Sequence, residues 1–256
     1  MNHIKLPIIL LSAGFVFVSS TAIAENAEQD IPFDEAELFF ELNDTDGDLG
    51  IHGKVDGDEW KRLQIEDPYE RRMMSVRANG RLKRQGITEL FFESAEPTFD
   101  ELDPADFFKR FPEGIYEIEG KTLDGEEREN EVYLSHVIPA APDDVTINGL
   151  PAAEDCDADL LPVVNAPVTL NWAPVLGSHS ELGKVGDVEV RYYEVVVEID
   201  DTDYKSTSII PGNLTQWTIA DTDFFTLSEE GEYKFEILVR AESGNKSAVE
   251  SCFIVE

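Results

Sequence analysis

Hydrophobic and polar residues alternate with a period of two along much of the chain, a pattern typical of β-strands that bury one face. In the stretch YYEVVVEI, Tyr193, Val195 and Val197 share one face of the predicted strand, whereas Glu194 and Glu198 share the other. The stretches VTLNW, QWTIA and GEYKFEILVRA repeat the pattern and predict further core residues at Val168, Leu170, Trp172, Trp217, Ile219, Tyr233, Phe235, Ile237 and Val239. Short strands separated by turn residues at this spacing predict a two-sheet β-sandwich.

Residues 33–140 also show mainly strand patterns. The stretches AELFFELN and GIHGKV alternate, and GIYEIEGKTLDGEERENEVYL predicts a hairpin around the turn Asp124-Gly125. One helix is predicted in TFDELDPADFFKRF, because Asp103 can cap it, Pro104 can occupy its first turn, and phenylalanines recur there at helical spacing.

Three stretches carry a family resemblance: VTLNWAPV, YYEVVVEI and LSEEGEYKFEILVRAESGNKS. With Trp172 ahead of Pro174, and Leu227 six residues before Tyr233, they resemble the second, third and sixth strands of a fibronectin type III domain, over about residues 142–256. The resemblance implies an immunoglobulin-like sandwich with these residues in its core and no catalytic residues of its own, typically a spacer or binding module. Ala241 lies farther from the strand tyrosine than in the family, so we expect a longer strand or a bulge.

The N-terminal half resembles an immunoglobulin-like sandwich more loosely. The run Glu113–Tyr116 is similar to the penultimate strand of such sandwiches, which implies that the Tyr116 hydroxyl bonds back to a nearby loop. We therefore expect an all-β protein of two immunoglobulin-like β-sandwich domains in tandem, the first with a short helical insertion.

The first residues have the pattern of a secretory signal peptide. Lys5 precedes an apolar run from Leu6 to Val18, and Ala22-Ile23-Ala24 forms a small-residue cleavage pattern. The run of about a dozen apolar residues is short for a membrane span. We expect an exported protein, secreted, periplasmic or at the cell surface. Its predicted parts are a signal peptide (1–24), a flexible N-terminal segment (25–32), a β-sandwich with an acidic loop (33–140) and a fibronectin type III-like domain (141–256).

The composition is strongly acidic, with 54 Asp and Glu against 20 Lys and Arg and a formal net charge of −34. This charge argues against binding to nucleic acid or to an anionic membrane surface. In an oxidising compartment, the only two cysteines, Cys156 and Cys252, are expected to form a disulfide. On the chain-entropy model, closing a loop of about 95 residues adds about 4–5 kcal/mol to the stability.

The stretch LNDTDGDLG places Asp44, Asp46 and Asp48 at alternate positions, and Asp56 follows in the next turn. An EF-hand is excluded, because the flanks alternate as strands and the glycine and glutamate of that motif are missing. Two interpretations remain open. The four carboxylates form a candidate calcium site, completed by loop carbonyls, or the stretch is an acidic hairpin turn held by side-chain hydrogen bonds from residues such as Asn43.

Eight basic residues fall between Lys61 and Arg84. Six of them form a candidate interaction patch: Arg71, Arg72, Arg77, Arg81, Lys83 and Arg84. The patch has two interpretations: it docks an anionic glycan or an acidic partner, or its arginines pair with the chain's own acids on an exposed sheet face. We expect Arg77, Arg81 and Lys83 to lie on an exposed strand.

The sequence offers little support for an enzyme. Glu93 and Glu96 form a carboxylate pair of the kind used in glycoside hydrolysis, but residues three apart on a strand face opposite sides. Ser178-His179-Ser180 lacks the nucleophile-elbow pattern. We expect no catalytic residues.

The predicted function is that of a non-catalytic exported protein acting in binding, adhesion or surface assembly, with calcium as a candidate stabilising cofactor. Its expected partner is an extracellular or periplasmic protein or glycan, with no nucleic acid and no membrane span. The alternative is a secreted glycan-binding or hydrolase-accessory protein. That alternative requires a row of exposed aromatic rings, whereas Trp60, Trp172 and Trp217 are all expected in the core.

Overall fold

The computed structural model describes residues 31–199 and 202–256, and over these residues the protein consists mainly of strands. The N-terminal half contains β1 (Glu35–Asn43), β2 (Asp48–Glu66), β3 (Arg72–Arg77), α1 (Leu82–Gln85), β4 (Ile87–Glu93), α2 (Pro104–Arg110), β5 (Gly114–Thr122) and β6 (Glu127–Leu134). The C-terminal half contains β7 (Thr146–Ile147), β8 (Leu150–Pro151), β9 (Val163–Val164), β10 (Val168–Asn171), β11 (Val190–Glu198), β12 (Lys205–Pro211), β13 (Gln216–Ile219), η1 (Phe224–Thr226), β14 (Glu232–Ala241) and β15 (Lys246–Val255). The prediction of an all-β fold is confirmed. The predicted signal peptide and residues 25–30 of the predicted flexible segment lie outside the described residues.

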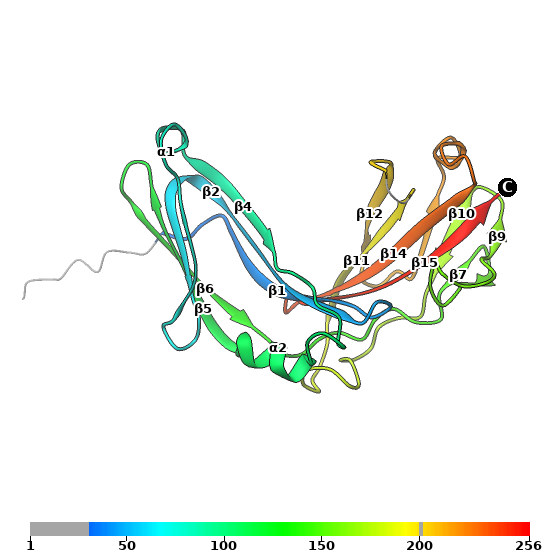
Figure 1. Ribbon diagram of the computed structural model, residues 1–256, viewed down its shortest axis with the longest axis horizontal. Coiled ribbons are helices and arrows are strands. Elements are labelled where there is room, and N and C mark those ends of the chain that lie inside the picture. Colours follow the sequence, from blue (N-terminus) through cyan, green and yellow to red (C-terminus); the bar gives the residue numbers. More distant parts are fainter. Residues whose placement is uncertain (1–30, 200–201) are drawn as a thin grey trace, which may run out of the picture.

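One large sheet runs through both halves of the protein (Figure 1). Across the described residues its strand order is β12-β11-β14-β15-β1-β2-β5-β6, with β3 and β4 paired to β2 and β9 paired to β15. The halves form the two arms of an open V, which meet where β1 and β15 lie side by side. These two strands are parallel, with Glu41 opposite Lys246 and Asn43 opposite Ala248. A smaller sheet of order β13-β10-β7-β8 packs onto the C-terminal arm.

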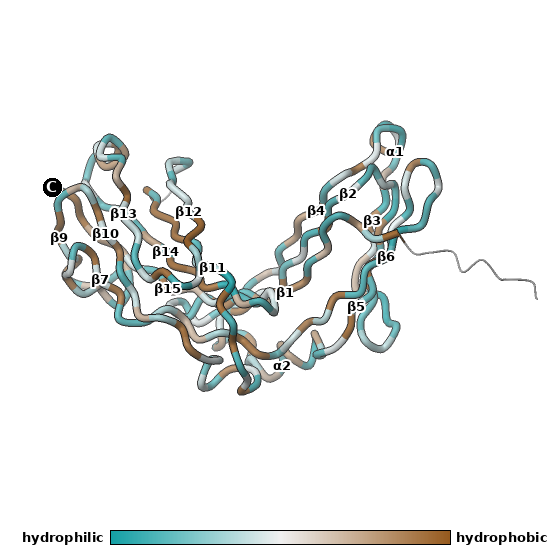
Figure 2. The backbone as a smooth tube through the Cα atoms, turned by 180° about the vertical axis from the view of Figure 1, so that it is seen from behind, coloured by the Kyte–Doolittle hydropathy of each residue, from teal (hydrophilic) through white to brown (hydrophobic). Residues whose placement is uncertain are grey.

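Each arm has its own hydrophobic core. The C-terminal core includes Trp172, Tyr193 and Phe235, and the N-terminal core includes Phe40 and Trp60. Burying each large side chain of this kind contributes about 1.5–3 kcal/mol. Hydrophobic residues gather along the strands, whereas the loops at the ends of the arms are mainly hydrophilic (Figure 2). The alternation in the sequence therefore predicted the buried faces of most strands.

The 19-residue strand β2 pairs with four other strands of the N-terminal arm. Its first part pairs with β1 and β4, and its last part pairs with β3 and β5. The pairing is irregular between Asp56 and Arg62, around the fully buried Trp60. Such irregularities bend a strand and increase its twist. They allow β2 to curve around the N-terminal core.

Helix α2 covers the N-terminal core as predicted. The Asp103 carboxylate accepts a hydrogen bond from the backbone N–H of Ala105 at 2.8 Å, and Pro104 occupies the first turn. Phe107 is buried and packs edge-to-face on Phe40, with the ring centroids 5.6 Å apart.

Asn245 joins the two arms. It is fully buried, and its side-chain Oδ1 accepts a hydrogen bond from the backbone N–H of Phe40 at 2.9 Å. Its Nδ2 donates to the carbonyls of Ser135 at 2.8 Å and Val137 at 2.9 Å. One side chain therefore satisfies backbone groups of β1 and of the segment after β6, which would otherwise be buried without partners.

Two tyrosines bond back to nearby segments, and for Tyr116 this is the bond that the resemblance implies. The Tyr233 hydroxyl donates to the carbonyl of Phe224 at 3.2 Å, and the Tyr116 hydroxyl donates to the carbonyl of Pro112 at 3.0 Å. Of the two alternatives for the strand that carries Ala241, the longer strand is present, because β14 runs for ten residues to Ala241. The register shift beside Ala241 places the extra residue, Arg191, on β11.

Two predictions of core residues were wrong. Leu227 is 48% exposed, and Phe225 packs on Tyr233 instead, with the ring centroids 5.1 Å apart. Trp217 is 37% exposed. It lies on β13, an edge strand of the smaller sheet, which has a neighbouring strand on one side only.

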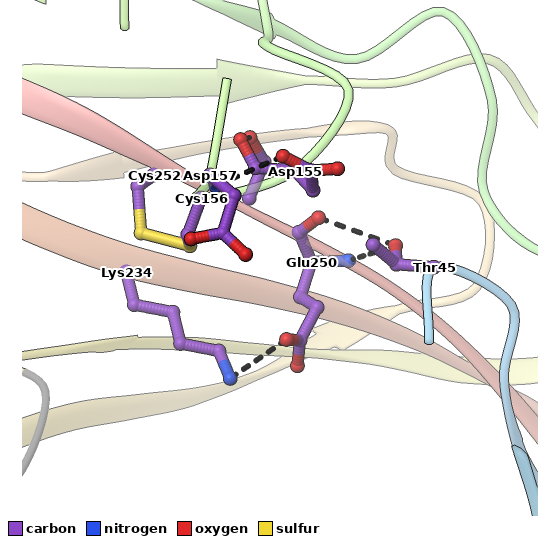
Figure 3. Close-up of a disulfide and its surroundings, with 8 residues drawn as sticks. Thr45, Asp155, Cys156, Asp157, Lys234, Glu250 and Cys252 are labelled. Atoms are coloured by element: carbon purple, nitrogen blue, oxygen red, sulfur yellow. Dashed lines mark hydrogen bonds and ion pairs between the residues drawn. A yellow bond between two sulfur atoms is a disulfide. The ribbon is translucent and has the colours of Figure 1, made fainter. Parts of the chain in front are cut away.

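The disulfide between Cys156 and Cys252 is confirmed and closes a sequence separation of 96 residues (Figure 3). It ties the chain ahead of β9 to β15. Close to it, Lys234 pairs with Glu250 at 2.8 Å. Among the described residues, no helix is both long and apolar enough to cross a lipid bilayer.

Candidate functional site

The acidic loop between β1 and β2 forms a hydrogen-bonded turn. The Asn43 side-chain oxygen accepts from the backbone N–H groups of Thr45 at 3.1 Å and Asp46 at 3.3 Å. These are the side-chain-to-backbone bonds that the second interpretation of this stretch predicted.

The same loop binds the C-terminal arm. His179 Nε2 lies 3.1 Å from a carboxylate oxygen of Asp44. Because His179 Nδ1 accepts from the N–H groups of Glu181 and Leu182, its proton lies on Nε2, which donates to Asp44. The hydroxyl of Thr45 donates to the carbonyl of Glu250 and accepts from the backbone N–H of that residue. The loop is therefore a contact between the arms.

The other two carboxylates of the candidate calcium set lie at different places. Asp48 begins β2, and burial, followed by the nearby charges of Glu96 and Asp46, raises its pKa to about 6. Asp56 lies eight residues farther along the same strand, which corresponds to about 26 Å in an extended strand. The structure therefore does not bring Asp56 to the loop. In the ranges 31–199 and 202–256, no cluster of three or more His, Cys, Asp or Glu side chains is placed to hold a metal.

The six residues of the predicted interaction patch are all exposed. Arg71 pairs with Asp67 at 2.6 Å and lies over the ring of Tyr69. None of the other five forms an ion pair with a described acidic residue. The interpretation that the chain's own acids pair with these residues therefore holds for Arg71 alone within the described part of the chain.

The predicted exposed strand ends at Arg77 and does not extend to Arg81 and Lys83. Residues 82–85 form the single helical turn α1. Gly80 and Gly86, on either side of it, have positive φ angles of 56° and 86°, a backbone conformation that interrupts a strand.

Five basic side chains and one hydroxyl surround a hollow of about 390 Å³ in the N-terminal arm, which we term the basic hollow: Lys61, Arg62, Ser75, Arg77, Lys83 and Lys121. They come from β2, β3, α1 and β5. Arg77 and Lys83 belong to the predicted patch, and Lys61 and Arg62 belong to the same basic stretch of sequence. The sequence did not predict that Lys121 belongs to this group, because only the pairing of β5 with β2 brings it to the hollow.

Three of these cations form a row across neighbouring strands. Arg62 on β2 lies directly opposite Arg77 on β3 and, on its other side, directly opposite Lys121 on β5. Directly opposed residues share a sheet face with their Cβ atoms about 4.5–5.5 Å apart, and like charges at such positions destabilise the sheet. Only Lys121 has an acidic partner in the described chain, its cross-strand neighbour Glu127.

Gln64 orients the side chain of Arg62. Gln64 is only 5% exposed, and its Oε1 accepts a hydrogen bond from Arg62 Nη2 at 2.8 Å. Gln64 in turn donates to the Glu66 carboxylate. Because an arginine has five N–H donors, this contact orients the guanidinium and leaves most of its donors for a ligand.

The candidate catalytic carboxylates are not paired. Glu96 interacts with His52 Nε2 at 2.8 Å and lines a separate hollow of about 510 Å³ beside α2. Glu93 is exposed and lies opposite His52 in the ladder between β2 and β4.

No protein-family model matches the chain, and no curated protein matches it. Among solved structures, it is similar to a two-domain fibronectin type III segment of chicken tenascin, at 12% identity and a TM-score of 0.30, with 86% of this chain and 97% of that one covered. It is also similar to the FN1–FN3 domains of chicken CNTN1, at 8% identity and a TM-score of 0.34, with 88% and 65% covered.

A third similar structure comes from a 1.5-MDa bacterial ice-binding adhesin, at 14% identity and a TM-score of 0.26, with 89% of this chain and 66% of that one covered. The chain thus spans about two thirds of the adhesin and CNTN1 structures. These three structures contain fibronectin type III or adhesin domains, the class of fold that residues 142–256 resemble. Such low TM-scores carry no argument about function.

Proposed function

We propose that the protein is an exported, non-catalytic binding protein that captures an anionic ligand in the basic hollow. The observation that carries this proposal is the row formed by Arg77, Arg62 and Lys121. Like charges directly opposed on a sheet each disfavour folding by about 0.2–1 kcal/mol. In a chain where acids outnumber bases by 54 to 20, a cationic row whose two arginines have no acidic partner among the described residues is better explained by a ligand than by stability.

The side chains around the hollow suit an anion. Arginine guanidinium groups bind carboxylate, phosphate or sulfate through paired hydrogen bonds, and lysine ammonium groups add charge without a fixed direction. Neither carboxylate nor aromatic side chains line the hollow. Charge, rather than stacking on a sugar ring, therefore selects its ligand.

The rest of the molecule supports a role in adhesion or surface assembly. The parallel ladder between β1 and β15 and the side chain of Asn245 join the arms, so the C-terminal arm holds the basic hollow at a defined position. The expected partner is an extracellular or periplasmic protein or glycan that carries negative charge.

The alternative of a glycan-binding or hydrolase-accessory protein has less support. It calls for a row of exposed aromatic rings, and Trp60 and Trp172 are buried. Trp217 is partly exposed, but it lies on the edge of the other arm's smaller sheet.

Calcium binding by the acidic loop stays a prediction, now limited to Asp44, Asp46 and Asp48. Its test is the thermal unfolding midpoint with and without millimolar calcium, in the natural protein and in a triple variant with alanine at these positions. A calcium-dependent rise in the natural protein alone supports the site, and an unchanged midpoint removes it.

The proposed function is tested by binding of the purified protein to immobilised polyphosphate, sulfated dextran and polyglutamate. We expect binding to at least one of these polyanions. The triple variant R62Q/R77Q/K121Q should bind about tenfold more weakly or worse, because it loses three charge-assisted contacts.

The matched control is K109Q/R110Q/K205Q, which removes the same charge from exposed residues outside the hollow. It should bind as the natural protein does. If none of the three polyanions binds, or if both variants lose binding equally, the proposed function is wrong.

A further inference from the structure

The basic hollow gathers more positive charge than a single carboxylate neutralises. Of its five cations, only Lys121 has a carboxylate partner among the described residues. The remaining four have none: Lys61, Arg62, Arg77 and Lys83. Lys61 donates instead to a neutral carbonyl, that of Leu123, at 3.2 Å. Four uncompensated charges thus converge on a hollow of about 390 Å³.

The size of the hollow restricts what can enter it. Its volume of about 390 Å³ corresponds to about a dozen water molecules at about 30 Å³ each. A compact group fits this space. The part of a ligand that all five basic side chains contact therefore has to carry several charges in a small volume.

Phosphate-type groups meet this requirement better than carboxylates. A phosphate monoester carries about −1.5 to −2 charges at neutral pH and three acceptor oxygens, whereas a carboxylate carries one charge and two oxygens. Two adjacent phosphate groups can therefore neutralise four cations, and two carboxylates leave half of them uncompensated.

We propose that the basic hollow binds a compact ligand with two or three adjacent phosphate-type groups. This inference rests on the proposed function and names the chemistry of its ligand. The row from Arg77 through Arg62 to Lys121 spans on the order of 10 Å across three strands. Arg62 and Arg77 each take one oxyanion group in a paired contact, and the lysines supply the remaining charge.

The field of the whole molecule favours a short ligand. The net charge of −34 weakens the binding of a long polyanion where it leaves the hollow, but does not prevent binding of the segment inside it. At physiological ionic strength, screening confines both this repulsion and the attraction of the hollow to about 8 Å. A short oligophosphate, or a sugar that carries phosphate groups close together, avoids the repulsion.

The inference is tested by isothermal titration of the purified protein, in about 0.15 M salt, with inorganic tripolyphosphate, a disulfated disaccharide and a triglutamate peptide. We expect tripolyphosphate to bind at one site, about tenfold or more tighter than the disulfated disaccharide or triglutamate. A sulfate ester and a carboxylate each carry a single charge, so the disaccharide and the peptide are the controls for charge density. The variant R62Q/R77Q should lose about tenfold or more of this affinity, while K109Q/R110Q should keep it.

The possible failures separate this inference from the proposed function. If triglutamate or the disulfated disaccharide binds as tightly as tripolyphosphate, through Arg62 and Arg77, the inference is overturned and an anionic ligand of the carboxylate or sulfate type remains. If no small probe binds but an immobilised polyanion does, the inference alone is overturned. If neither kind of probe binds, both proposals are overturned. Thermal unfolding of each variant confirms that lost binding does not reflect lost folding.

Discussion

Arg62 on β2 lies directly opposite Arg77 on β3, and both side chains line the same hollow. An arrangement that served stability alone would place an acid at one of the two positions. The same two strands have such a pair farther along, where Arg72 lies opposite Glu66. The two pairs lie on the same two strands and differ in charge, so substitutions in each pair can be compared directly.

Replacing Arg77 by glutamine should stabilise the protein by about 0.2–1 kcal/mol, because it removes a repulsive cross-strand pair. The measurement is the free energy of unfolding from urea denaturation. The matched control is R72Q, which removes a cation that lies opposite an acid, Glu66, on the same strand and should be neutral or slightly destabilising. Equal effects of the two substitutions would contradict the electrostatic account of the row.

Replacing Asn245 by alanine should destabilise the protein by about 3 kcal/mol, because it leaves two buried backbone groups and one partly buried group without partners, at about 1–3 kcal/mol each. Asn213, which is exposed, provides the control, since its replacement by alanine should change the stability by less than about 0.5 kcal/mol. A small effect at Asn245 would show that its side chain does not join the arms.

The stability should fall as the pH rises from about 4 to about 7. Burial, followed by the charges of Glu41 and Glu250, raises the pKa of Glu236 to about 7, and the pKa of Asp48 is raised to about 6. Both values lie above the ordinary ones of 4.5 and 3.8. The folded state therefore binds more protons than the unfolded chain in this window, and stability is lost as these carboxyls ionise.

The variant E236Q tests the larger of these two contributions. We expect it to be more stable than the natural protein at pH 8, by on the order of 1 kcal/mol, and to show a shallower dependence on pH. Urea denaturation at pH 5 and pH 8 measures both quantities. A natural protein that is more stable at pH 8 than at pH 5 would contradict the assignment.

Removing the disulfide with C156S/C252S should destabilise the protein by about 2–5 kcal/mol, because the bond closes a loop of 96 residues in the unfolded chain. Anion binding should be unchanged in the folded variant, because the residues that line the basic hollow belong to the N-terminal half, on β2, β3, α1 and β5. Loss of binding in a folded variant would show that the arms are coupled in a way that this account does not include.

Local patterns in the sequence predicted much of the fold. Alternation placed Tyr193 and Phe235 in a core, and Asp103 and Pro104 marked the start of α2. These features depend on neighbours within a few residues, where side-chain periodicity and capping act. The disulfide was predicted for a different reason, since Cys156 and Cys252 are the only cysteines in the chain.

Features that depend on distant pairing were not predicted. The contact of β1 with β15 joins residues about 200 positions apart, and no local pattern indicates which strand edge meets which. Lys121 joined the hollow through the same kind of pairing, with β2. Trp217 became exposed because β13 is an edge strand, and the alternation of a single strand does not reveal its place in a sheet.

The most direct test of the central claim is the charge reversal R77E, followed by two measurements on the same sample. The account predicts that the midpoint of urea unfolding rises, because the introduced carboxylate faces Arg62 across the ladder. It also predicts that affinity for the anionic probe falls by about tenfold or more, because the hollow loses one cation and gains an anion. A variant that binds the probe as the natural protein does, or that is destabilised by the reversal, would contradict the claim that the basic row exists for a ligand.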